Sequence, residues 1–514
     1  MSDTAPEPDP ATTPAAEPGP PPSPEHPLAA EHPLALEIAL DPAEVPALWR
    51  HPALARETGT KPRGLADECI WLDTAGGHLA RLGEALEVPR KGPRRHLASL
   101  PPPGFSLPGA APVTLGELTA DEVPPAVKDE VLLPIAAFTG RRVEATCGAL
   151  RLELRHGNLR CVAGEAPVAR LYLSGPASEV LALSGALARD LRLLPTAAGL
   201  AETARALSRQ ERPRPRRLGA PDIGAVETVE AALAFAIAHL TEVLLVHAPR
   251  ARPELGPEGV HQCRVAARRL RSCLKQFRPV VDGSELRALD AQLGDFARAL
   301  GEARDLDVFL LNLGAELAAS AGVADRRVAG LLRTARARRE AAYTALRVML
   351  DGPEFRRLIW SATRLAALRT WGSEAPATDD APLRPFARAV LARRWRRLLK
   401  RGADIEDQPA ESLHELRLDA KRLRYAAELF APLWPGKAAK RFLRRLSAVQ
   451  DALGVANDTH VARVLVASLG GRGGAGAWAI GLAEGFALAH GAGARGKALS
   501  AWKRLDHTDP FWTD

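Results

Sequence analysis

Two segments of this chain each combine one histidine with arginines and lysines at the spacing of a helix face. In the first segment, His261 is followed by Arg264, Arg268, Arg271 and Lys275. At about 100° and ~1.5 Å per residue, these side chains fall on one stripe of an α-helix about 20 Å long. Neighbouring like charges destabilise a helix by a few tenths of a kcal/mol per pair, and a bound polyanion relieves that repulsion. The stripe therefore predicts a surface on which arginine engages phosphate oxygens in pairs and lysine acts as a point charge.

The second segment repeats the pattern 153 residues later. It carries His414, Arg417, Lys421 and Arg424, and it has Glu428 where the first segment has a lysine. Apolar residues lie on the opposite side of both helices, so each can bury one face and present its cations on the other. If both helices contact one polyanion, we expect the first stripe to bind it more strongly than the second.

Other interpretations of these residues remain open. A charged stripe is often only a solvated helix face, although here no acids alternate with the cations and the pattern recurs. The histidines could form hydrogen bonds near the start of each helix, or donate to a bound phosphate that raises their pKa. A metal site is disfavoured because neither histidine has a neighbouring donor in an H-x-x-H or H-E-x-x-H arrangement.

The helices that position these stripes belong to the second half of the chain. The net charge of +8 is unevenly distributed: residues 213–514 hold 48 basic and 34 acidic residues, a balance of +14, and the upstream residues carry −6. A basic half attracts polyanions, but charge alone does not separate polyphosphate from nucleic acid or an anionic membrane. The five cysteines form no C-x-x-C pair, which indicates neither a disulfide framework nor a zinc ribbon.

Changes of composition and hydrophobic period along the 514 residues predict an α+β multidomain protein. Residues 1–33 are rich in proline and alanine and are predicted to be a disordered tail. Residues 34–210 alternate in short apolar runs, which predicts a strand-rich domain with one helix near 178–192. Residues 211–221 form a proline- and arginine-rich linker, whose prolines block regular structure and whose charges keep it solvated. Residues 222–512 have helical periodicity.

The helical region contains an internal repeat. The shift that superimposes the two basic segments also places residues 293–305 on 446–458 without a gap. Two distant blocks that obey one offset indicate a tandem duplication, with halves at about 222–370 and 380–512. We therefore expect two four-helix bundles related by a pseudo-two-fold axis.

These motifs resemble a known family. The pattern H-x-x-R-x-x-x-[RK]-R-x-R, continued through Tyr425 in its second copy, the LG-x-x-x-D segments at 300–305 and 453–458, and the closing AWKRLDHTDPFW are similar to the CHAD domain, the conserved histidine α-helical domain. The resemblance covers about 222–512 and implies paired four-helix bundles that bind inorganic polyphosphate in a basic channel between them. It implies that the channel is lined by His261, Arg264, Arg268, Arg271, His414, Arg417, Lys421 and Arg424, with Arg304, Lys440, Arg441 and Arg444 as further candidates.

Residues 34–210 resemble a CYTH, or triphosphate tunnel, domain in the order of their segments, LEIALD (36–41), WLDTAGGHLARLGEALEVPR (71–90), LRLELRHGNL (150–159) and ARLYLSGPASEVLALSGALARDL (169–191). Active members of that family carry acidic and basic motifs that hold metal and triphosphate inside a barrel. In this chain Glu37 remains, but the other motif positions hold Ala39, Asp41, Glu87, Pro89, Arg170 and Tyr172. Because phosphoryl transfer depends on metal-held charge, we expect a degenerate domain without catalysis.

The leading hypothesis is a non-enzymatic polyphosphate-binding protein that needs no cofactor or metal. The CHAD resemblance also implies attachment to polyphosphate or polyester granules. A metal-dependent triphosphatase in the N-terminal domain and nucleic-acid binding are the alternatives; the second is disfavoured because aromatic residues are not interleaved with the cations. The sequence has no apolar run of about 18 residues and no signal peptide, so we expect a cytoplasmic protein without a membrane span. A homodimer is a further expectation.

Overall fold

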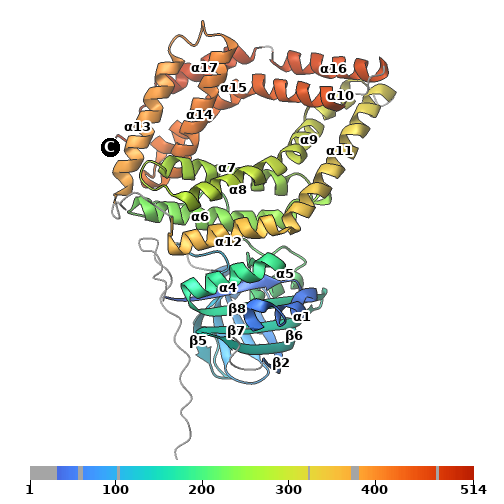
Figure 1. The fold of residues 1–514 in the computed structure, drawn as a ribbon, viewed down its shortest axis with the longest axis vertical. Coiled ribbons are helices and arrows are strands. Elements are labelled where there is room, and N and C mark those ends of the chain that lie inside the picture. Colours follow the sequence, from blue (N-terminus) through green and yellow to red (C-terminus); the bar gives the residue numbers. More distant parts are fainter. Residues whose placement is uncertain are drawn as a thin grey trace, which may run out of the picture.

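The structure is a computed structural model that describes residues 32–55, 62–100, 105–321, 325–371, 381–469, 474–491 and 493–513. An antiparallel, barrel-like sheet domain is followed by a helical domain, which confirms the α+β fold expected from the sequence. The two domains are stacked along the long axis of the molecule (Figure 1). The tail predicted over residues 1–33 lies almost wholly outside the described residues.

The N-terminal domain is built on one nine-stranded sheet in the order β5-β4-β3-β2-β6-β7-β8-β1-β9. The segment just before β5 returns to β1 through a bridge between Leu36 and Ala110, which curls one edge of the sheet towards the other. Helix α4 (Ala177–Asp190) covers one face and fulfils the helix predicted near 178–192. The strands are β1 (Pro33–Leu40), β2 (Arg63–Thr74), β3 (Glu84–Pro89), β4 (Arg94–Ala98), β5 (Val113–Leu118), β6 (Leu132–Cys147), β7 (Leu150–Cys161), β8 (Gly164–Pro176) and β9 (Leu193–Pro195).

The helical domain contains two bundles. In the first bundle, α6 packs on α7 and α12, and α8 packs on α7 and α12. In the second, α13, α14, α15 and α17 pack in succession. The first bundle consists of α6 (Val229–His247), α7 (Glu258–Phe277), α8 (Ser284–Ala299) and α12 (Pro353–Leu368), and the second of α13 (Leu383–Gly402), α14 (Ala410–Phe430), α15 (Lys437–Leu469) and α17 (Ala494–Asp506).

The repeat found in the sequence is visible in the helices. A shift of 153 residues places α6 on α13 and α7 on α14, with ends that agree within two residues. The third helix differs between the copies: α15 is continuous, whereas its counterpart breaks between α8 and α9 (Gly301–Leu311). The two histidine-led helices begin at Glu258 and Ala410, so each histidine lies a few residues inside its helix and does not start it.

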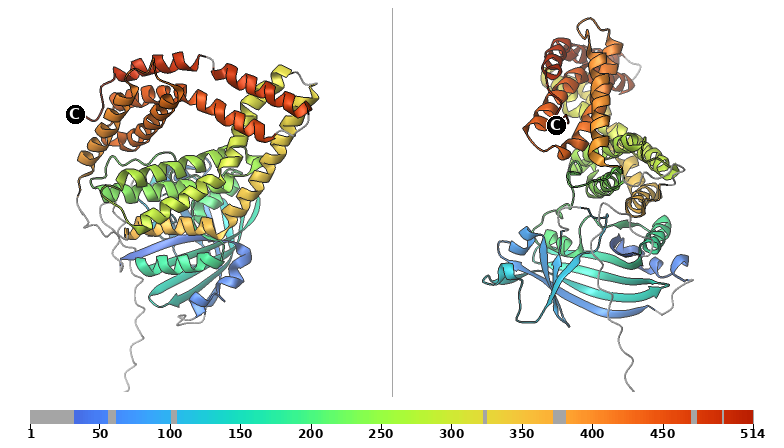
Figure 2. Two further views of the ribbon diagram at one scale, coloured as in Figure 1. Left: turned by 45° about the horizontal axis from the view of Figure 1, so that its top comes forward. Right: turned by 90° about the vertical axis from the view of Figure 1, so that its left-hand side faces the viewer.

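Two pairs of helices extend from the bundles and meet. From the first bundle, α9 and α10 (Leu313–Ala321) run beside α11 (Arg326–Asp351), and from the second the end of α15 runs beside α16 (Gly474–Gly491). The guanidinium of Arg327 lies 3.6 Å from the ring centre of Trp478, which joins α11 to α16. The bundles and these extensions form a ring of helices (Figures 1 and 2).

The sheet domain is packed firmly against the first bundle. Helix α4 lies along α12, and one continuous apolar core includes side chains from both domains. Two side chains of α12 also donate hydrogen bonds to backbone carbonyls below them: Arg356 to Ala188 at 2.8 Å and Trp360 to Leu193 at 3.0 Å. The second bundle has no comparable support from the described part of the sheet domain.

The connecting segment 211–221 is irregular, as its prolines predict, but its arginines are not simply solvated. Arg214 bonds to Glu202, Arg216 donates to the carbonyl of Ala110 at 2.9 Å, and Arg217 donates to Ser106 at 3.1 Å. The segment is therefore fastened to the sheet domain.

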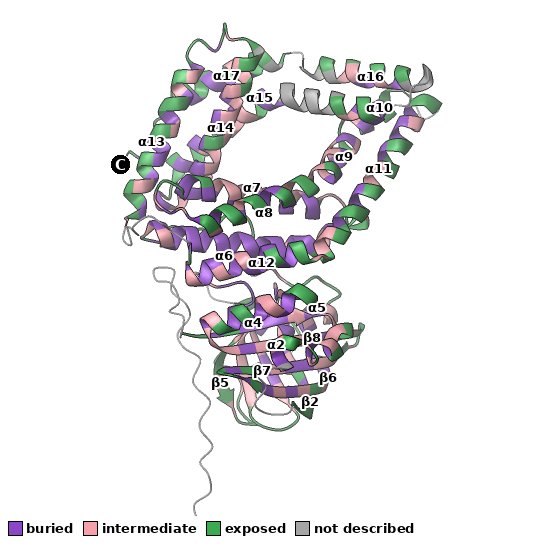
Figure 3. Cartoon of the chain, viewed as in Figure 1, coloured by how far each residue is buried: buried purple, intermediate pink, exposed green. Residues whose placement is uncertain are grey.

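Helix α6 is mostly apolar and is buried on nearly every side. It is the one described helix, measured over Val229–Arg250, that is long and apolar enough to span a membrane, and 89% of its apolar window is buried inside the fold. Figure 3 shows it buried along most of its length. The side chain of Thr228 caps its start by accepting a hydrogen bond from the backbone of Ala231. Within this fold, α6 is the central helix of the first bundle.

Candidate functional site

A cavity of about 700 Å³ lies between the two bundles, where α7 faces α14. Its walls come from α7, α8, α13 and α14, with Gly301 at the start of α9. Eight basic side chains line it, and none of its described lining residues is a carboxylate. The basic residues are Arg264, Arg268, Arg271, Lys275, Arg298, Arg394, Lys421 and Arg422.

Helix α7 supplies the longest wall of the cavity. Its apolar residues, among them Leu270, Cys273 and Phe277, are buried in the first bundle, as the helical period predicts. This burial turns the first stripe towards the cavity, where Arg264, Arg268, Arg271 and Lys275 all lie. Two of these cations have protein partners: Arg264 bonds to the carbonyl of Ala297 at 3.4 Å and Arg271 pairs with Asp290 at 2.7 Å.

The second stripe approaches the first at Lys421. Burial and the charges of Arg268, Arg417, Arg264 and Arg424 lower the pKa of this lysine to about 8. The pKa of Arg268 is also lowered, chiefly by burial. The guanidinium of Arg268 lies 5.2 Å from the ring centre of Tyr425, and its buried Nε finds no hydrogen-bond acceptor among the described residues. The two stripes therefore concentrate positive charge around Lys421 and Arg268, whereas Arg271 and Arg424 are each paired with a carboxylate.

Three lining cations were absent from the sequence prediction. Arg298 lies on α8, Arg422 on α14 next to the second stripe, and Arg394 on α13. The Nε of Arg394 is buried without a hydrogen-bond acceptor in the described part of the chain, and burial together with nearby arginines lowers its pKa. The run LARRWRRLLKR at 391–401 was the available signal, but it lies outside the duplicated blocks on which the sequence prediction rested.

Four other predicted residues lie near the cavity without lining it. Arg417 and Arg424 act on the charge of Lys421, and Arg304 acts on that of His261. His261 is half-buried, and burial followed by the Arg304 charge lowers its pKa, so the free protein holds it neutral near pH 7. Arg424 is ion-paired to Glu428 at 3.2 Å.

The other carboxylate oxygen of Glu428 lies 3.6 Å from the guanidinium of Arg269 on α7, so this acid also links α14 to α7. The remaining predicted residues do not join the cavity. His414 is exposed on α14, and the exposed side chains of Lys440, Arg441 and Arg444 lie on α15 away from the lining.

The cavity's residue types suit binding more than catalysis. Its lining offers guanidinium and ammonium donors, one serine hydroxyl and one phenol, Tyr425. Burial raises the pKa of that phenol, so Tyr425 stays protonated. Across the described residues, no group of three or more His, Cys, Asp or Glu side chains could hold a metal ion. All five cysteines are free thiols.

The interior of the sheet domain is a second place where charged residues gather. Arg155 reaches Asp67 at 2.7 Å and Glu87 at 3.4 Å, and Glu87 also pairs with Arg95. Glu37 is completely buried, and its carboxylate lies 3.3 Å from Arg170. These acids and bases come from several strands of the sheet, and each of the three acids has an arginine within 4 Å.

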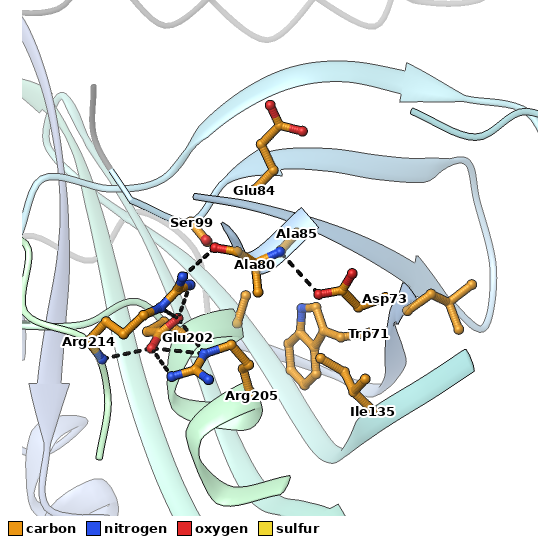
Figure 4. A pocket seen from close by; sticks show the side chains of 12 residues that line it. Trp71, Asp73, Ala80, Glu84, Ala85, Ser99, Ile135, Glu202, Arg205 and Arg214 are labelled. Atoms are coloured by element: carbon orange, nitrogen blue, oxygen red, sulfur yellow. Dashed lines mark hydrogen bonds and ion pairs between the residues drawn. The ribbon is translucent and has the colours of Figure 1, made fainter. Parts of the chain in front are cut away.

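Helix α5 (Leu200–Ser208) fills the other end of this interior. Leu200 and Ala204 pack against Trp71 and Phe138 in a separate apolar cluster. In Figure 4 Arg205 and Arg214 converge on the buried carboxylate of Glu202, at 2.8 Å and 2.6 Å. The small cavity drawn there has about 10 Å³ of free volume, less than one water molecule needs comfortably.

Comparison with known proteins identifies the family of the helical region. Residues 235–467 match the CHAD domain family model. Among solved structures, the CHAD domain from the plant Ricinus communis is 28% identical, with 57% of this chain and 96% of that chain covered and a TM-score of 0.47. PptA from Streptomyces chartreusis is 20% identical, with 54% and 99% covered and a TM-score of 0.42. No curated protein matches the sequence. On the strength of the family match, the helical half of this chain contains a CHAD domain.

Proposed function

We propose that this protein binds inorganic polyphosphate in the cavity between α7 and α14. The observation that supports this most directly is the lining itself, with eight cations and no described carboxylate. Mutual repulsion among these cations costs free energy in the unliganded protein, and a ligand with one negative charge per unit removes that cost. Arginine suits the role because its planar donors bind phosphate oxygens in pairs.

The central experiment measures long-chain polyphosphate binding to the full-length protein. Because the core is continuous between the domains, the intact chain is the appropriate material. Replacing Arg264, Arg268 and Lys421 by alanine removes three facing cations and should weaken binding by at least about 100-fold, since a charged hydrogen bond contributes about 1.5–3 kcal/mol.

The matched control replaces three exposed arginines of α11, namely Arg326, Arg333 and Arg336. These substitutions remove the same net charge as those of the cavity variant, but the three arginines lie outside the cavity lining. The control should retain most of the affinity. If the cavity variant binds as tightly as the wild type, or if both variants lose the same amount, the cavity is not the binding site.

Competition separates polyphosphate from nucleic acid. The only aromatic side chain of the described lining is Tyr425, and it already stacks with Arg268, so the cavity lacks a platform on which successive bases could stack. Polyphosphate should displace single-stranded or duplex DNA at equal phosphate concentration. Displacement in the opposite direction would favour nucleic acid as the ligand.

We further propose that the N-terminal domain is a degenerate CYTH-like scaffold without triphosphatase activity. The support is that Glu37, Asp67 and Glu87 have arginine neighbours within the sheet domain, and that α5 occupies part of the interior. Phosphate release from tripolyphosphate with Mg²⁺ or Mn²⁺ tests this directly. Sustained release that is lost in Glu37→Gln would overturn the proposal.

Attachment to polyphosphate-containing granules in the cytoplasm follows from the same binding. We expect the wild-type protein to sediment with polyphosphate granules and the cavity variant to remain in the supernatant. Equal sedimentation of both would assign granule attachment to another surface.

A further inference from the structure

The cations of the cavity continue onto the outer surface of α13. Arg394 lies in the lining, and Arg393 and Arg397 are close enough to lower its pKa by their charge. Arg396 and Lys400 follow within the next two turns. At about 100° per residue, these side chains pass from the cavity side of α13 round to its solvent side. We call Arg393, Arg396, Arg397 and Lys400 the outer track.

Most of the outer track is available to a ligand. All four side chains are exposed. The buried carboxylate of Asp419 pairs with Arg397 at 3.1 Å and also holds Arg401 at 2.7 Å and Arg422 at 2.8 Å. None of the described carboxylates forms an ion pair with Arg393, Arg396 or Lys400. One carboxylate therefore serves three guanidinium groups, and the balance of the track stays positive.

The duplicated bundle has no such track. The positions of α6 equivalent to Arg393, Arg394, Arg396, Arg397 and Lys400 hold Leu240, Thr241, Val243, Leu244 and His247, and all five are buried. The reason is positional, because α6 is enclosed by α7, α12 and α13, whereas one side of α13 faces solvent. The continuation of the basic surface therefore occurs on one side of the cavity only.

We infer that the bound polyanion is longer than the cavity and leaves it across α13, so that contacts on the outer track make the protein select long chains over short ones. The inference rests on the proposed function. From Arg264 to Lys275 the lining of α7 spans only about 16 Å. A short polyanion fits within that length and can contact Arg394 of α13 but not the outer track, whereas a long chain must pass over the exposed residues of that track.

The test compares tripolyphosphate with long-chain polyphosphate on the full-length protein. The triple variant Arg393→Ala, Arg396→Ala, Lys400→Ala should bind long chains roughly tenfold or more weakly. The slope of log Kd against log salt concentration should also fall by about 2, because each lost phosphate contact removes about 0.7 from the slope for a single strand. Tripolyphosphate binding should be unchanged, which also shows that the variant is folded.

The control variant is again Arg326→Ala, Arg333→Ala, Arg336→Ala, which should change neither slope nor affinity for either ligand. Unchanged long-chain affinity and slope in the α13 variant would overturn the inference. So would an equal loss for both ligands, or an equal loss in the control. If the wild type binds neither ligand, the proposed function itself fails, and that result is distinct from the others.

Discussion

The ammonium group of Lys421 lies among four arginines, and this crowding makes the proposed binding of polyphosphate depend on pH. Its pKa of about 8 in the free protein results first from burial and then from the charges of its neighbours. A phosphate chain placed beside it favours the charged form and raises that pKa. Binding above about pH 8 must therefore take up a proton.

We predict that affinity for long-chain polyphosphate falls roughly tenfold as the pH rises from about 8 to about 10, the value of one charge-assisted contact. Lys421→Arg should flatten this profile because a guanidinium stays charged. Titrations across that range would check the prediction, and the same pH dependence in both proteins would contradict it. In the absence of ligand the sign for stability is opposite: the unfolded chain holds the lysine proton more tightly, so stability rises between pH 8 and about 10.5.

The positions of individual residues in the site were also the most predictable feature of the sequence. A 100° helical projection placed Arg264, Arg268, Arg271 and Lys275 on one face, and all four line the cavity. The same projection could not find Arg394, because it was applied only to the repeated blocks. It could not anticipate that Glu428 would pair with Arg269 of the other bundle, since that contact depends on how α7 and α14 cross.

At the element scale, α6 and α13 show how duplicated helices diverge with their surroundings. The buried position of α6 removes it from any contact with a ligand and leaves Glu242 in an apolar setting. Burial raises the pKa of this carboxyl to about 7, although Arg216 and Arg217 partly oppose the shift. The Arg217 guanidinium lies 3.8 Å from it, and burial lowers the pKa of the neighbouring His239 to about 4.

We predict that Glu242→Gln raises the melting temperature at pH 8. A buried acid with a raised pKa keeps its proton in the folded protein after the unfolded chain has lost it, so wild-type stability falls from about pH 4.5 to about pH 7 and stays lower above. Glutamine removes a penalty on the order of a few kcal/mol. Melting curves from pH 5 to 8 should converge at the acidic end. Glu254→Gln, an exposed acid, provides the control, and a lower melting temperature for Glu242→Gln at pH 8 would refute the prediction.

The break between α8 and α9 is an element that the sequence did not reveal. The repeat alignment treats residues 293–305 as one segment, but the helix ends at Ala299 and restarts at Gly301. In the second copy α15 runs through the equivalent position. Arg304 therefore lies on a separate helix beside His261 and outside the cavity lining, while Gly301 contributes to the lining.

At the scale of the whole molecule, the division into a strand-rich and a helical half was predictable because the hydrophobic period changes near residue 222. How the halves join was not, because their contacts link residues about 170 positions apart. Arg356 and Trp360 of α12 bond to carbonyls at Ala188 and Leu193. A sequence that reads as two domains and a linker thus folds around one continuous core.

We predict that Trp360→Ala destabilises both domains together. Its side chain is 4% exposed, and its removal should cost about 3–5 kcal/mol through the cavity left behind. Calorimetry should show a single lower transition in which sheet and helix signals melt together. A barrel transition that stays at the wild-type temperature would show that the domains unfold independently. Trp478→Ala, on the distant α16, should leave the sheet signal unaffected.

The packing of α12 against the sheet domain has a consequence for proteolysis and for biosynthesis. A helical half separated from the sheet domain would lose the cover over the side of α12 that packs on α4, together with the hydrogen bonds of Arg356 and Trp360. The liberated helical half would expose that surface to chaperones, to membranes and to other copies of itself. Retention of the sheet domain would then be favoured even if it performs no chemistry, because it keeps the helical half from aggregating.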